Sequence, residues 1–109
     1  MLVLKKRDLT GHDVFEWMKG RYDSVHWKED SVYVTEETFA EAGLEKWFIQ
    51  VLGFFHYFGP TEVTEAEWTA VKALVNENGS EPARRLTGEL DEWVKECFKS
   101  HACFTICGI

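Results

Sequence analysis

The feature that most constrains the fold is a pair of consecutive helix signatures in the second half of the chain. Thr64 and Glu67 form a capping box ahead of an apolar stripe, which predicts a helix over 65–78. Ser80 as N-cap, with a proline in the first turn, predicts a second helix over 81–99. The apolar stripes of both helices predict a largely buried set, namely Trp68, Leu74, Leu86, Leu90, Trp93, Val94 and Phe98.

Weaker patterns predict the elements nearer the two ends of the chain. A polar start followed by apolar residues at helical spacing favours a third helix over about 11–22. Alternation on both sides of a polar triplet indicates a hairpin over 24–35. Residues 102–107 are typical of a strand, and residues 2–4 could form another.

The segment 36–58 fits two structures. Its apolar residues fall on one helical stripe, yet the β-branched and aromatic content of 47–58 is equally acceptable for strands. A helix over about 36–52 is favoured, followed by a non-helical stretch over 54–61 that ends at a Gly-Pro pair.

Length and composition predict one domain, residues 1–109. The chain has 109 residues, of which 45% are apolar, enough for a single core. The predicted fold class is α+β, with three to four helices packed on a small antiparallel sheet. No apolar run approaches the ~20 residues that a membrane span needs, and the three cysteines crowd into 97–107, so reduced thiols and a cytoplasmic location are expected.

The excess negative charge is confined to the middle of the chain. The net charge is −7, and residues 31–81 carry nine Glu against only Lys46 and Lys72. The aromatic run 54–58 lies in the same stretch. Such a surface favours a basic protein partner, because complementary charge steers encounter and aromatic anchors hold the complex. Direct nucleic-acid binding and anionic membranes are disfavoured by the same charge.

The predicted contact residues come from this acidic stretch. Acidic side chains are expected to lie along the contact and two aromatic side chains to anchor it. Plain solubility is the competing explanation for the charge, and burial in the core is the competing explanation for the aromatics. The candidate partner-binding residues are Glu36, Glu37, Glu41, Glu62, Glu65, Trp47 and Tyr57.

The residue patterns predict neither an enzyme nor a cofactor. Cys97, His101, Cys103 and Cys107 have the residue types of a zinc site, but their spacing does not match paired ligands on a knuckle. No phosphate loop, serine elbow or oriented base–nucleophile pair is present in the sequence. No metal site, no catalytic residue and no intramolecular disulfide are therefore expected.

Residues 54–68 resemble a stretch of small bacterial immunity proteins, which protect cells from contact-dependent inhibition and related polymorphic toxins. The similarity is an aromatic segment that closes on Gly-Pro-Thr, followed by a helix with acidic residues and a Trp in its first turn. The resemblance implies a cytosolic inhibitor that binds one toxin domain, often a basic nuclease, and covers its active site.

Two other functions remain open. A DNA-mimicking inhibitor, of phage or anti-restriction type, would use its carboxylates in place of phosphates, although this chain is less acidic than that role usually requires. A small metal or redox module would use the cysteines near residue 100.

Overall fold

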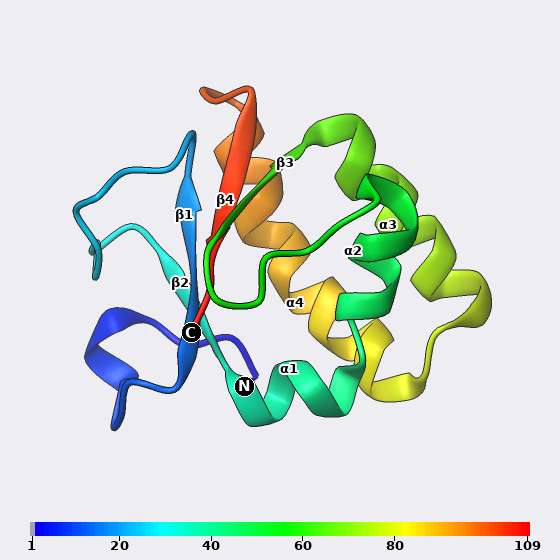
Figure 1. Ribbon diagram of the computed structural model, residues 1–109, viewed down its shortest axis with the longest axis horizontal. Coiled ribbons are helices and arrows are strands. Elements are labelled where there is room, and N and C mark those ends of the chain that lie inside the picture. Colours follow the sequence, from blue (N-terminus) through cyan, green and yellow to red (C-terminus); the bar gives the residue numbers. More distant parts are fainter. Residues whose placement is uncertain (1) are drawn as a thin grey trace.

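Four strands form one antiparallel sheet, and the helices pack on one of its faces (Figure 1). This computed structural model describes residues 2–109. The strand order is β2-β1-β4-β3, and every neighbouring pair is antiparallel. The predicted α+β class is confirmed. The elements are a 3-10 turn (η1, Lys6–Asp8), β1 (Val14–Lys19), β2 (Val32–Thr35), α1 (Glu36–Ala42), α2 (Glu45–Leu52), β3 (Pro60–Thr64), α3 (Glu65–Asn78), α4 (Glu81–Phe98) and β4 (Cys103–Cys107).

The helices α3 and α4 confirm the strongest sequence prediction. Thr64 and Glu67 form the reciprocal capping box of α3, and the Ser80 hydroxyl accepts a hydrogen bond of 3.2 Å from the backbone of Ala83 at the start of α4. Most of the predicted core residues are buried, whereas Leu74 and Phe98 are only half-buried. Local caps and a 3.6-residue period were sufficient to place both helices.

The single helix predicted over 36–52 is wrong, because the chain breaks it at Gly43. This residue has φ +66° and ends α1, and its backbone N–H bonds the carbonyls of Phe39 and Ala40. Glycine adopts this left-handed conformation without the strain that a Cβ would add. The change of direction lets Phe39 on α1 and Phe48 on α2 both enter the core.

The helix predicted over 11–22 is also wrong, since Val14–Lys19 is the central strand β1. Phe15 and Trp17 pack in the helix-covered core, while Glu16 and Met18 are buried on the opposite face. A strand buried on both faces loses the alternation of apolar and polar residues that identifies an amphipathic strand. The apolar positions then match a helical stripe by coincidence.

Only the second arm of the hairpin predicted over 24–35 is a strand. The first arm lies in residues 20–31, an irregular segment that forms no strand. The real partner of β2 is β1, with Trp17 opposite Val32. Residues 2–4 contribute one isolated bridge, between Leu4 and Tyr33, rather than a strand.

The last strand lies inside the sheet, between β1 and β3. The strand predicted over 102–107 is confirmed as β4. The non-helical structure predicted for 54–61 is confirmed as well, but the edge strand β3 that starts at Pro60 was not predicted. Proline is tolerated there because an edge strand can spare one backbone donor.

Candidate binding surface

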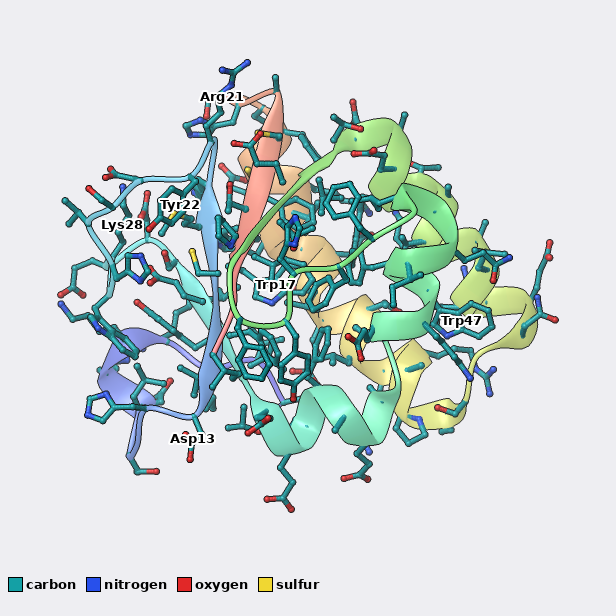
Figure 2. All side chains as sticks on the ribbon, in the orientation of Figure 1. Asp13, Trp17, Arg21, Tyr22, Lys28 and Trp47 are labelled. Atoms are coloured by element: carbon teal, nitrogen blue, oxygen red, sulfur yellow. The ribbon has the colours of Figure 1, made fainter. Side chains whose placement is uncertain are left out.

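The sheet has a second face, which the helices leave uncovered. Figure 1 shows the helices on one side of the strands and the segment 20–31 on the other. Figure 2 shows the same division in side chains, with Trp17 directed toward the helices and Tyr22 and Lys28 on the opposite side. The register places Glu16 opposite Cys107 on this second face.

Glu16 is the buried carboxylate that holds the segment 20–31 against the sheet. Its side chain accepts hydrogen bonds from the backbone N–H of Trp27 at 2.8 Å, from that of Lys28 at 3.0 Å and from the Ser31 hydroxyl at 2.7 Å. Only 4% of the residue is exposed. All three contacts are donated to the carboxylate, so both of its oxygens act as acceptors.

Beside Glu16 the second face is hollowed. The hollow has a volume of about 340 Å³ and lies between β1, the segment 20–31, the loop 57–60 and the end of β4. We call it the β1 hollow. The residues that matter for its chemistry are Glu16, Tyr22, His26, Trp27, Phe58 and Cys107.

Aromatic side chains form the rim of the β1 hollow. The Tyr22 hydroxyl lies 3.2 Å from Nε2 of His26, and the two rings meet edge to face. Trp27 stacks on Tyr33 with ring centroids 5.9 Å apart. Its φ is +62°, and its backbone N–H donates to Glu16. Tyr22 is 44% exposed, Trp27 38% and Phe58 81%. These rings are large apolar groups that remain open to solvent.

The predicted contact residues on α1 form one acidic group. Glu37 and Glu41 are exposed, and Glu36 accepts a hydrogen bond of 2.5 Å from the Tyr57 hydroxyl. That hydrogen bond to a carboxylate, together with burial, raises the pKa of Tyr57 to about 12. Tyr57 is half-buried, and the hydrogen bond to Glu36 ties its ring to α1.

The other predicted contact residues lie elsewhere. Glu62 on β3 and Glu65 at the start of α3 are exposed, and Figure 1 places the β3–α3 junction and α1 at opposite ends of the molecule. Trp47 on α2 is half-buried, with Nζ of Lys46 4.8 Å from its ring centre, and Figure 2 shows it on the side away from Tyr22. The structure thus divides the predicted surface instead of gathering it.

The β1 hollow lies between the two acidic groups. Glu62 accepts a hydrogen bond of 3.3 Å from the backbone of Tyr22, which lines the hollow. On the other side, a second depression of about 370 Å³ is lined by Asp13, Glu36 and Glu37 and shares Val14 with the hollow. The two acidic groups therefore border one aromatic depression.

The acidic stretch is not neutralised from within. Of its nine Glu, only Glu81 forms a salt bridge among residues 2–109, and its partner Arg84 lies outside the stretch. Lys72 pairs with Asp91, at 3.0 Å, and Lys46 lies over a tryptophan ring. The negative charge of this stretch is thus available to a partner.

The cysteines are buried free thiols. Burial raises the pKa of Cys97 and Cys103, and it raises the pKa of Cys107 to about 12. The His101 side chain is exposed. Within residues 2–109, no three His, Cys, Asp or Glu side chains are grouped so that they could hold a metal ion.

A larger groove of about 1050 Å³ runs along α4 beside the N-terminal segment. Its lining carries basic side chains, such as Lys5, Arg7 and Arg85, and acidic ones, such as Glu89 and Glu92. Charges of both signs line it, so this groove has no preference for a partner of one charge.

Glu16, Tyr22, Trp27 and Phe58 are not among the residues predicted to bind a partner. The signal for Glu16 is present in the sequence, because it is the one charged residue in the apolar run from Val14 to Met18. Placing that run in a helix concealed the signal. The contacts from Tyr22, Trp27 and Phe58 depend on how distant segments meet.

Comparison of the chain with protein-family models, with curated proteins and with solved structures gives no match. In the part that the structure describes, residues 2–109, no helix combines the length and the apolar character needed to cross a bilayer.

Proposed function

We propose that this protein is a small acidic binding protein that neutralises a toxin domain by covering its basic active-site face, in the manner of the bacterial immunity proteins that residues 54–68 resemble. The observation that carries this proposal is the uncompensated charge. Among residues 2–109, eight of the nine Glu in the stretch 31–81 form no salt bridge. Surface charge of one sign raises the rate of encounter with a partner of the opposite sign.

The exposed aromatic residues support the same proposal. Phe58 is 81% exposed and lines the β1 hollow together with Tyr22 and Trp27. Protein interfaces are commonly anchored by large aromatic rings surrounded by polar and charged residues. Glu36, Glu37 and Glu41 would flank this anchor on one side, and Glu62 and Glu65 on the other.

The test starts by isolating the partner through co-purification and then measures association rates at low and high salt. Glu37→Lys and Glu62→Lys are expected to slow association and to flatten its dependence on salt. Glu77→Lys is the matched control, since Glu77 makes the same charge change at an exposed position near the end of α3, outside the two acidic groups. Equal rates for all three variants would remove the acidic surface from the mechanism.

A further inference from the structure

We propose that the β1 hollow binds an arginine side chain of the basic partner. This inference rests on the proposed function and adds the chemical group that the surface recognises. Its starting point is Glu16, whose carboxylate has no cationic partner: among residues 2–109, no Lys, Arg or His nitrogen lies within 4 Å of it to form a salt bridge. The nearby Lys28 ammonium is instead bonded to Asp23 at 2.7 Å.

The carboxylate retains capacity for one more donor. An ionised carboxylate accepts about four hydrogen bonds, and Glu16 receives three. Two of these reach Oε2, while Oε1 receives only the N–H of Trp27. Glu16 and Trp27 both line the hollow.

The aromatic rim favours a planar cation. A guanidinium group stacks on aromatic faces and is more weakly hydrated than an ammonium group, so it leaves water at a lower cost. Phe58, Tyr22 and Trp27 present rings at the mouth of the hollow. A guanidinium group seated between them would donate one N–H toward Glu16.

The size of the hollow limits its occupant. A volume of about 340 Å³ is at the lower end of the range for small-molecule sites, roughly 300–1,000 Å³. Such a space has room for one large side chain, and the acidic groups beside it disfavour the phosphates of a nucleotide. The acidic groups on both sides of the hollow add charge complementarity for an arginine carried on a basic surface.

The experiment titrates ¹⁵N-labelled protein with the peptide acetyl-Gly-Gly-Arg-Gly-Gly-amide and, in parallel, with its citrulline counterpart, which has the same shape without the charge. The arginine peptide is expected to shift the amide signals of Trp27, Phe58 and Gly108 in a saturable way, and the citrulline peptide is not. Equal shifts with both peptides, or arginine shifts confined to α1, would overturn the inference.

Two variants of one loop provide the matched comparison. Phe58→Ala removes a ring of the hollow and should lower the affinity for the arginine peptide by about two- to fivefold, the range of an exposed cation–π contact. Phe54→Ala removes a ring that is 47% exposed in the same loop but outside the hollow. The affinity of this variant for the arginine peptide should equal that of the unmodified protein. Equal weakening by both variants would contradict the assignment. Glu16→Gln should reduce affinity further, provided that its spectrum retains the folded pattern.

The failure of this inference is distinguishable from that of the proposed function. If the peptide binds as expected but Glu37→Lys and Glu62→Lys leave the association rate with the partner unchanged, the arginine site stands and the acidic binding function falls. If those variants slow association but the peptide does not bind at the hollow, the arginine site falls and the function stands.

Discussion

The indole N–H of Trp68 on α3 donates a hydrogen bond of 2.9 Å to Oδ1 of Asp91 on α4. Asp91 also forms salt bridges with Lys72 at 3.0 Å and with Lys95 at 3.3 Å. Burial alone would raise the pKa of Asp91, but the hydrogen bonds from the indole and the two ammonium groups outweigh it and lower the pKa. One carboxylate thus joins the two longest helices.

This pairing predicts a loss of stability in acid. Because the folded pKa of Asp91 lies below its unfolded value of about 3.9, its contribution is present above that pH and disappears as the pH falls through the folded pKa. Asp91→Asn should lower the free energy of unfolding by about 1–3 kcal/mol at pH 7 and by much less at pH 3. Urea unfolding at the two pH values measures this difference.

The control for Asp91 is Glu96→Gln, which removes the exposed pair of Glu96 with Lys99. An exposed ion pair contributes about 0–1 kcal/mol, so this variant should change stability little at either pH. A deficit of Asp91→Asn that stays the same at pH 3 and pH 7 would contradict the role given to its charge.

The second prediction concerns the hold of Glu16 on the segment 20–31. Glu16→Ala leaves three buried or half-buried donors without their acceptor and should cost at least about 2 kcal/mol. It should also speed tryptic cleavage at Arg21 and Lys28, because the segment opens locally. Ser31→Ala removes one of the three bonds and should cost about 1 kcal/mol. Unchanged cleavage in Glu16→Ala would show that other contacts hold the segment.

The third prediction contrasts two glycines. A Cβ on Gly108 would lie 2.3 Å from the backbone oxygen of Tyr57 and 2.5 Å from the backbone nitrogen of Gly59, so Gly108→Ala should destabilise the fold by about 1–3 kcal/mol. Gly88, exposed in the middle of α4, has open space around that position. Gly88→Ala should stabilise the protein by about 0.5–1 kcal/mol. Thermal unfolding of both variants checks the opposite signs.

The fourth prediction is that the thiols are protected in the folded state. Cys107, with a pKa of about 12, is only about 0.01% ionised at pH 8, and Cys97 has no exposed surface. Reaction with a thiol reagent at pH 8 should be at least about a hundredfold slower in the native protein than in urea. Rapid labelling of any of the three thiols in native protein would place that thiol nearer to solvent.

The elements that the sequence predicts are those governed by local chemistry. The caps at Thr64 and Ser80 and the apolar stripes behind them determine α3 and α4 without help from distant residues. In contrast, β1 is determined by its neighbours: apolar residues on both faces match a strand only because β2 and β4 lie beside it and residues 20–31 cover it.

The candidate surface follows the same division. Net charge and its concentration in residues 31–81 are additive properties that the sequence shows directly. The β1 hollow cannot be read from the sequence in this way, because its residues come from separate parts of the chain. Trp27, which has a left-handed backbone, and Phe58 both line it together with Glu16. Such long-range contacts depend on the tertiary structure and are not visible in local sequence patterns.

The position of β4 inside the sheet determines when the fold can form during synthesis. Pairing Glu16 with Cys107 closes a loop of about 90 residues, and β3 also waits for the same strand. A nascent chain that ends before Cys103 can pair β1 with β2 but leaves one edge of β1 and the whole of β3 unpaired. Unpaired edges attract other chains. On the ribosome this exposure lasts until β4, which is made after the other three strands, has taken its place between β1 and β3.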